Sequence, residues 1–138
     1  MSTFRVFDIA GAGMSAQSVR LNTVASNLAN AESVSSDPAT AYKARHPVFQ
    51  ATLDASGNGG EGASVAVRGI VESQAPAEKR YDPASPLADS NGYVYAPNVN
   101  TVEEMVDMIS ASRSYQNNVE VMNTARNLLL ATLKLGQG

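Results

Sequence analysis

Two long segments, one near each end of the chain, repeat apolar residues at helical spacing. In the first segment, large apolar residues recur every seven positions, and smaller ones follow three positions after several of them. This seven-residue repeat is the pattern of a coiled coil. It predicts one helix over about residues 3–32, which ends at the turn-forming residues 33–38. The large repeating residues are Phe7, Met14, Leu21 and Leu28.

The second segment alternates steps of three and four residues, which places one stripe of side chains along a helix over about residues 102–135. Thr101, with Glu104 three positions later, is typical of a capping box at the helix start. Lys134 and Gly136 are typical of a helix end. The stripe comprises Met105, Met108, Ser112, Tyr115, Val119, Met122, Arg126, Leu129 and Leu133.

The residues between these helices change to the period of β-strands. Val48–Leu53 and Ser64–Val71 predict a hairpin whose tip is the glycine-rich stretch Asp54–Gly62. Gln74–Pro86, with three prolines, predicts an extended loop. Asn91–Gly92 predicts a tight turn into a final short strand that begins at Tyr93.

The predicted fold class is therefore mainly α with a small β-rich middle. The N-terminal and C-terminal helices are expected to pair in a coiled-coil-like manner beside the β unit. The corresponding division of the chain is an N-terminal helix at 1–36, a β-rich middle unit with flexible loops at 37–99, and a C-terminal helix at 100–138.

Composition excludes several classes of function. The 138 residues include 10 basic and 13 acidic side chains without a basic cluster, which argues against binding to nucleic acid. The absence of cysteine excludes disulfides, thiolate zinc sites and thiol nucleophiles. The first residues lack the pattern of a cleaved secretory signal. The longest apolar run, Leu128–Ala131, is too short to insert directly into a membrane.

Two candidate chemical sites are weak. Gly57, Gly59 and Gly62 fit the spacing of a dinucleotide-binding loop, but a strand pattern follows them where such a loop should open a helix. A flexible hairpin tip is the simpler interpretation. His46 is the single histidine and has no recognisable partner for catalysis or metal binding. We therefore expect no enzyme activity, no cofactor and no metal site.

The helical stripes alone leave two interpretations open: the interior of an ordinary helical hairpin, or surfaces that pack against other subunits. The amide side chains in both helices exceed what one solvated face needs, and buried Asn can fix register and partner choice. This favours assembly, with a cytoplasmic helical adaptor or export chaperone as the alternative. The amides are Asn22, Asn27, Asn30, Gln116, Asn117, Asn118, Asn123 and Asn127.

Several motifs resemble the bacterial flagellar axial proteins. Val24–Ala31 resembles the N-terminal signature of that family, and Tyr42–Lys43 and Pro47–Phe49 resemble the segments that follow it. Ser33 stands where the family usually has Thr, which keeps a hydroxyl group. The C-terminal motifs resemble the C-type subunits of the proximal rod within this family, and they comprise Asn91–Val94, Pro97–Asn100, Glu103–Ile109, Arg113–Gln116 and Asn118–Glu120.

This resemblance implies a structural subunit of the basal-body rod, exported through the flagellar type III channel without signal cleavage and located in the periplasmic part of the flagellum. The terminal helices would line a hollow tube that transmits torque for motility, with the β-rich middle as an outer patch. The implied partners are other rod proteins, membrane-ring and export-gate components, and further copies of the chain.

On this basis the expected assembly interface lies along the helix stripes. Asn27 and Asn30 are expected to form hydrogen bonds at the end of the first helix, either to the following turn or to a neighbouring subunit. The expected apolar contacts are Phe7, Met14, Leu21 and Leu28 against Met108, Tyr115, Val119, Met122, Leu129 and Leu133.

Overall fold

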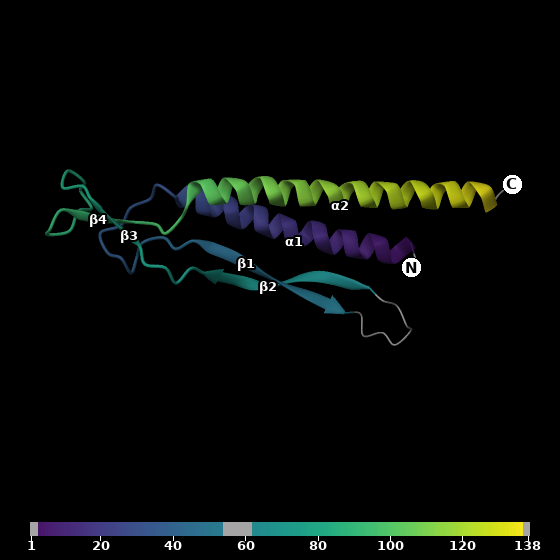
Figure 1. Cartoon of the computed structure of the whole chain (residues 1–138), viewed down its shortest axis with the longest axis horizontal. Helices are drawn as coiled ribbons and strands as arrows, with labels where there is room; N and C mark the ends of the chain where they lie inside the picture. Colours follow the sequence, from purple (N-terminus) through teal and green to yellow (C-terminus); the bar gives the residue numbers. More distant parts are fainter. Residues whose placement is uncertain (1–2, 54–61, 137–138) are drawn as a thin grey trace.

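The computed structural model describes residues 3–53 and 62–136 as two long helices and two small antiparallel sheets. The helices lie side by side, one hairpin runs along the first helix, and the second sheet lies at one end of an elongated molecule (Figure 1). This confirms the predicted fold class. The elements are α1 (Thr3–Asn30), β1 (Arg45–Leu53), β2 (Ala63–Glu72), β3 (Glu78–Tyr81), β4 (Tyr93–Ala96) and α2 (Thr101–Gly136).

The two helices pair antiparallel. Near one end of the pair Asn27 bonds to Glu104, and farther along it the backbone of Gly13 lies against the side chain of Asn118. Residue numbers thus fall along α1 as they rise along α2. With 36 residues against 28, α2 is the longer helix. Its C-terminal end runs past the first described residue of α1 (Figure 1).

The start of α2 differs from the predicted capping box. Asn100 is the cap, because its Oδ1 accepts hydrogen bonds from the backbone N–H groups of Val102 at 3.1 Å and Glu103 at 3.3 Å. The prediction of a Thr101–Glu104 box is wrong. The Glu104 side chain is buried and accepts a bond from Asn27 at 2.9 Å, so it does not turn back to the helix start.

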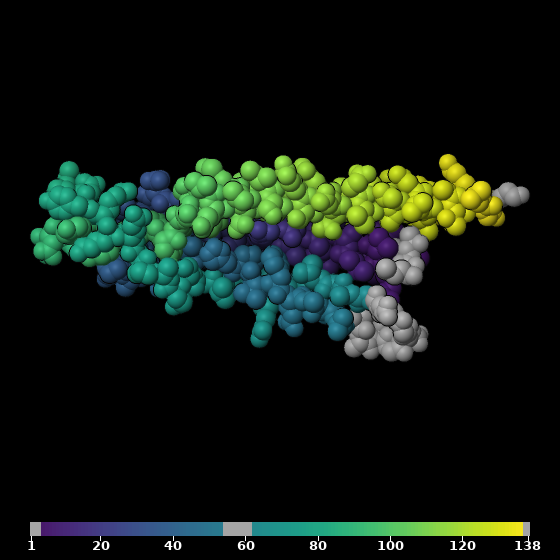
Figure 2. Space-filling model, in the orientation of Figure 1, coloured from purple at the N-terminus to yellow at the C-terminus, as the bar shows by residue number. Residues whose placement is uncertain are grey.

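The predicted hairpin is confirmed. β1 and β2 pair antiparallel from Arg45 opposite Glu72 to Leu53 opposite Ala63, and the register shifts between Val48 and Phe49, where Arg68 of β2 is the extra residue. An isolated two-stranded hairpin is at best marginally stable in water, and here it packs along α1 (Figure 2). Most of its predicted tip, 54–61 with Gly57 and Gly59, lies outside the described residues.

The second sheet corrects one prediction and confirms another. Residues 74–86 were expected to form a loop, but within them β3 pairs antiparallel with β4. All four β3 residues are exposed, so the strand carries no alternating apolar pattern and depends on its partner strand. The predicted turn before β4 is present, with Gly92 at a positive φ of 80°. On its other side, β4 forms a bridge with Ser35.

The core is built from small side chains. Its buried apolar residues are alanines and valines, and many large apolar residues lie on the surface. Small residues allow backbones to approach closely but bury little apolar area each. The elements therefore pack closely while the larger side chains remain available to other molecules. The buried apolar residues are Ala10, Ala16, Val24, Ala41, Ala44, Val94, Ala96, Ala111 and Ala125.

Two glycines of α1 provide a matched test of this packing. An added Cβ at Gly11 meets no atom within 4 Å, whereas one at Gly13 would lie 2.8 Å from Nδ2 of Asn118. We expect Gly11→Ala to raise the free energy of unfolding by about 1 kcal/mol through helix propensity. Gly13→Ala should lose that gain, because Asn118 must give up its bond to the Ser114 carbonyl. Urea unfolding measures both. In an Asn118→Ala background the gain at Gly13 should return, and equal stabilisation at both glycines in the native background would contradict the packing.

Asp89 gives the second sheet a dependence on pH. Its carboxylate accepts bonds from the backbone N–H groups of Tyr93 and Asn91 and from the Tyr95 hydroxyl. These bonds, that from Tyr93 foremost, lower the pKa of Asp89 below 3.8. A lowered pKa in the folded state contributes stability above pH 3.8, which is lost as the pH falls through the lowered value. Asp89→Asn keeps an acceptor for both N–H groups but has no carboxyl group to titrate, so we expect it to lose less stability on acidification than the native protein does. Urea midpoints at neutral pH and below pH 3.8 measure it, and identical acid losses in both proteins would contradict this role.

Candidate functional site

The face of α1 that meets α2 is a column of small and polar residues at seven-residue spacing. Gly13 contacts Asn118, Arg20 forms an ion pair with Asp107 at 2.7 Å, and Asn27 follows one repeat later. Arg20 and Asp107 are partly exposed, with side chains 24% and 42% accessible. The centre of the helix pair is therefore a close approach of backbones with polar contacts.

The hairpin lies against a second face of α1. The residues of this face stand one position before those of the face that meets α2. Arg5 and Ala12 line a pocket together with Gly62 of the hairpin. Farther along, Ser26 lines a pocket with Ile70 of β2. One residue along an α-helix is a rotation of about 100°, so these positions are turned away from α2. α1 is thus the central element, in contact with α2 and with both strands of the hairpin.

The predicted apolar column of α1 forms a third face. Its residues stand one position after those of the face that meets α2. All four of its large residues are half-buried, whereas Ala10, Gly13 and Val24 are buried. The sequence pattern placed the helix contact on these large residues together with smaller ones three positions later, and of this set the structure buries the smaller Ala10 and Val24. Close backbone contact leaves no room for large groups between the helices, so they lie at its margin. The four are Phe7, Met14, Leu21 and Leu28.

The predicted residues of α2 show the same displacement. Tyr115 is 37% exposed and Leu133 is 55% exposed, and the other predicted residues are half-buried. The buried positions of α2 are Glu104, Ala111 and Ala125. Contact of the predicted residues with other subunits stays a prediction. The half-buried ones are Met108, Val119, Met122 and Leu129.

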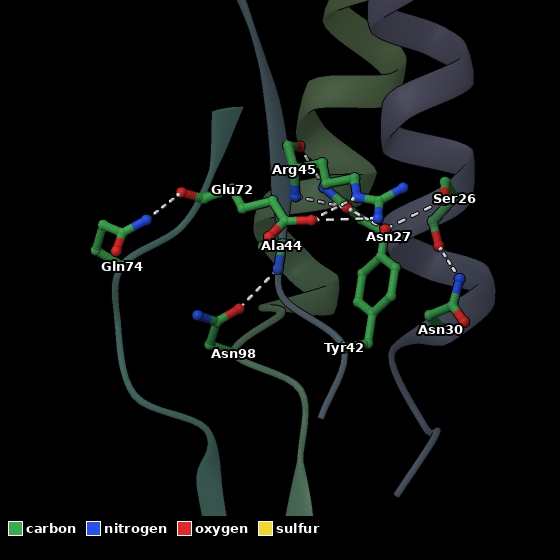
Figure 3. Close-up of polar contacts among 9 residues, drawn as sticks. All are labelled: Ser26, Asn27, Asn30, Tyr42, Ala44, Arg45, Glu72, Gln74 and Asn98. Carbon is green, nitrogen blue, oxygen red and sulfur yellow. Dashed lines mark hydrogen bonds and ion pairs between the residues drawn. The ribbon is translucent and has the colours of Figure 1, made fainter. Parts of the chain in front are cut away.

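Asn27 is the centre of a polar junction that joins α1, α2 and β1 (Figure 3). Its side chain is wholly buried. Nδ2 donates to the carbonyl of Arg45 at 2.8 Å and to Oε1 of Glu104 at 2.9 Å. Oδ1 accepts from the backbone N–H of Arg45 and from the Tyr42 hydroxyl, each at 2.9 Å. An Asn amide has two donor hydrogens and two acceptor lone pairs, and here all four are used.

A second layer of contacts holds these partners in place. The Arg45 guanidinium lies 5.6 Å from the ring centre of Tyr42 and forms an ion pair with Glu72 at 3.2 Å. The Ala44 N–H donates to Oδ1 of Asn98 at 2.7 Å, which ties the segment before α2 to the start of β1 (Figure 3). Three segments distant in the sequence therefore meet at one end of the helix pair.

Asn30 has a more local role than Asn27. Its Nδ2 donates to the Ser26 carbonyl one turn earlier, at 2.8 Å, and its own carbonyl accepts from the N–H and hydroxyl of Ser33. The Ser33 hydroxyl thus ends α1. The Asn30 amide itself bonds back into the helix rather than to the following turn.

Glu104 is the functional residue that sequence reasoning missed. It is 4% exposed, and its Oε2 has no hydrogen-bond partner among residues 3–53 and 62–136. Its charge and its place near a helix start favoured a capping role. The signal that could have identified it is its phase, since Glu104 stands in helical register with Met108 and the buried Ala111.

The other candidate chemistry remains isolated. His46 is exposed on β1 opposite Val71. Within the described part of the chain, no group of three or more His, Cys, Asp or Glu residues could hold a metal ion. Of the two helices described, neither is long and apolar enough to cross a membrane. The main polar feature of the described residues is the junction that holds the two helices together.

The fold is an elongated pair of helices with two small sheets, and comparisons with known proteins identify its class as flagellar basal-body rod proteins. Residues 90–135 match the model described as flagellar basal body rod FlgEFG protein C-terminal, and residues 7–34 match that described as flagella basal body rod protein.

Similar whole proteins give the more specific assignment. The chain is 52% identical to the flagellar basal-body rod protein FlgC of Salmonella typhimurium, over 99% of this chain and 100% of that protein. Identity is 50% to FlgC of Escherichia coli O157:H7, with the same coverage. It is 36% to FlgC of Buchnera aphidicola subsp. Baizongia pistaciae, again over 99% of this chain and 100% of the relative. The chain belongs to the FlgC family of flagellar basal-body rod proteins and is a structural rod subunit.

Replacing Asn27 tests the junction. Asn27→Ala removes the partner of both Arg45 backbone groups and of the buried Glu104 side chain, so we expect a loss of about 3 kcal/mol in the free energy of unfolding. Asn30→Ala removes a single contact of a half-buried amide and should cost less than about 1 kcal/mol. Urea unfolding of both variants measures the difference. Equal small losses would show that the junction does not hold the fold together.

Proposed function

We propose that this rod subunit assembles through its terminal helices into a hollow axial structure that transmits torque for motility. The observation that carries this proposal is the apolar surface of α2. Monomeric proteins rarely expose large contiguous apolar patches, and those that do commonly use them for binding. The exposed large apolar residues of α2 are Val102, Met105, Val106, Ile109, Tyr115, Val121, Leu128, Leu130, Leu133 and Leu135.

The third face of α1 adds to this surface. Phe7, Met14, Leu21 and Leu28 are half-buried, and Phe4 in the first turn is 69% exposed. The face is turned away from the hairpin, which covers the earlier column of the repeat. A neighbouring helix that packs here would complete the burial of side chains that α2 covers only in part.

The mechanism is one of packing rather than bond chemistry. When each subunit contacts the next through two different surfaces, the rotation between neighbours decides the shape of the assembly. A rotation that returns to the first subunit gives a ring, and one that does not gives an open helical filament. Force applied at one end of such an assembly passes through the packed helices. The small core supports this interpretation, since a subunit with little internal burial gains much from its neighbours.

The finer features of this proposal concern partners and place. The rod subunit would contact other rod proteins, further copies of itself, and the membrane-ring and export-gate components. It would work in the periplasmic part of the basal body and reach it by flagellar export without a cleaved signal. It would have no catalytic activity. A net charge of −3 without a basic cluster supports protein partners over nucleic acid.

Leu133 tests the assembly surface without disturbing the fold. Its side chain is 55% exposed in the last turns of α2, so Leu133→Asp should leave the thermal unfolding midpoint nearly unchanged. A charge at an apolar contact is costly, so we expect loss of the subunit from purified basal bodies and loss of swimming in soft agar.

Leu133→Met is the matched control, because it keeps an apolar side chain of similar volume and should swim normally. Normal incorporation of Leu133→Asp would count against an apolar contact at this site. A subunit found only in the cytosol of flagellated cells would contradict the rod function itself.

A further inference from the structure

The interface between α1 and α2 holds a polar pair that stability alone does not explain. We propose that Asn27 and Glu104 set the register of α2 along α1, and so position the last two turns of α2 for contact with a neighbouring subunit. Their bond of 2.9 Å is the buried side-chain hydrogen bond that links the two helices directly. The positioning step rests on the proposed assembly through the terminal helices.

The cost of this pair argues for a role in specificity. Glu104 is 4% exposed, and one of its two carboxyl oxygens is buried without a hydrogen-bond partner in the described residues. Replacing a buried polar or charged group by an apolar one of similar volume is often neutral or stabilising. An interface selected for stability alone would carry a Leu or Met here. Buried polar residues are best attested as devices that fix register.

The rest of the interface discriminates weakly between registers. Ala111 and Ala125 of α2 are buried and lie fourteen residues apart, and Asn118, midway between them, lies against Gly13 of α1. If α2 slid by seven residues, Ala125 could take the place of Asn118 beside Gly13, so this contact does not exclude the shifted register. The Arg20–Asp107 ion pair is partly exposed, and such pairs contribute little.

A slip of seven residues is costly only at the junction. In the direction that shortens the projecting end of α2, Asn27 would face the level of Ala111 instead of Glu104, so a buried amide would lose a charged acceptor. The slip would also pull Asn98, three residues before α2, away from the Ala44 N–H, whose hydrogen bond it accepts. The pair therefore penalises the wrong alignment, as a specificity device does.

The register determines where the end of α2 lies. Val6 lines a groove with Ala125 and Leu128, and the end of α2 runs past the first described residue of α1 (Figure 1). A slip of seven residues would move this segment by about 10 Å along α1. Leu130, Leu133 and Leu135, which are 45%, 55% and 84% exposed, would move with it. A neighbouring subunit that packs on these leucines therefore depends on the junction at the opposite end of the helix pair.

Engineered cysteines can report the register, because the chain has none of its own. Val6 and Ala125 line one groove, so Val6→Cys with Ala125→Cys reports the native alignment. Val6→Cys with Thr132→Cys reports an alignment shifted by seven residues. Each cysteine pair is placed in the otherwise native chain and in an Asn27→Leu/Glu104→Leu background. Disulfide formation in the purified full chain is then measured, and rod incorporation is measured in cells without the engineered cysteines.

We expect only the native disulfide in the native background, and both disulfides together with loss of rod incorporation in the Leu/Leu background. Gln17→Leu is the matched control, because Oε1 of Gln17 is also buried without a partner but the residue bonds to no group on α2. It should keep the native disulfide alone and incorporate normally. Glu104→Gln retains an acceptor for Asn27 and should behave as the native chain does.

A native disulfide alone in the Leu/Leu background would overturn the proposal, and so would a shifted register with normal incorporation. If that double variant fails to fold by circular dichroism, Glu104→Leu alone leaves Asn27 three of its four bonds and should give a smaller shifted fraction. No shifted fraction there would likewise overturn the proposal. Absence of the native chain from basal bodies would instead reject the proposed function, because the disulfides are read without a rod.

Discussion

The structure depends on a close approach of two helices along a line of small side chains. Gly13, Ala10 and Ala111 allow the backbones of α1 and α2 to lie near each other, and this leaves no space between them for larger groups. The large apolar residues of both helices are consequently displaced to the margins and to the outer faces. The same constraint that holds the subunit together therefore creates the surfaces by which a rod subunit contacts its neighbours.

Close packing of small residues holds the two helices near each other but does little to fix their alignment along each other. The alignment is fixed by the junction around Asn27. Its amide forms hydrogen bonds with Glu104 of α2, with the backbone of β1 and with the Tyr42 hydroxyl. Because a buried unpaired polar group is costly, only one arrangement of these segments satisfies them all. The subunit thus combines a weakly specific apolar interface with one highly specific polar contact at its end.

The long-period features of the fold could be predicted from the sequence, because helix and strand periods extend over many residues. Both helices, the main hairpin and the turn at Gly92 were found in this way. β3 was missed, because four exposed residues carry no alternation and the strand forms only when β4 is beside it. The capping box at Thr101 was wrong, because the tertiary contact of Glu104 with Asn27 overrides the local preference.

The sequence predicted that the two helices pair, but not which residues lie at the centre of their contact. The seven-residue repeat of α1 identified the column of Phe7 and Leu28, whereas the structure places Gly13 and Asn27, one residue earlier in the repeat, at the contact with α2. Which column faces the partner helix depends on how closely the backbones approach, and single-sequence periodicity carries no information about that distance. Asn27 was singled out for its amide, whereas Glu104 was hidden by a charge that suited a helix start.

The central claim is that neighbouring subunits cover the apolar surfaces of the helix pair, and electron cryo-microscopy of purified basal bodies tests it most directly. The account predicts a map in which helices of adjacent subunits pack on the outer face of α2 around Ile109 and on its projecting end around Leu133. A map in which those side chains face open solvent, while the hairpin alone touches other subunits, would contradict it.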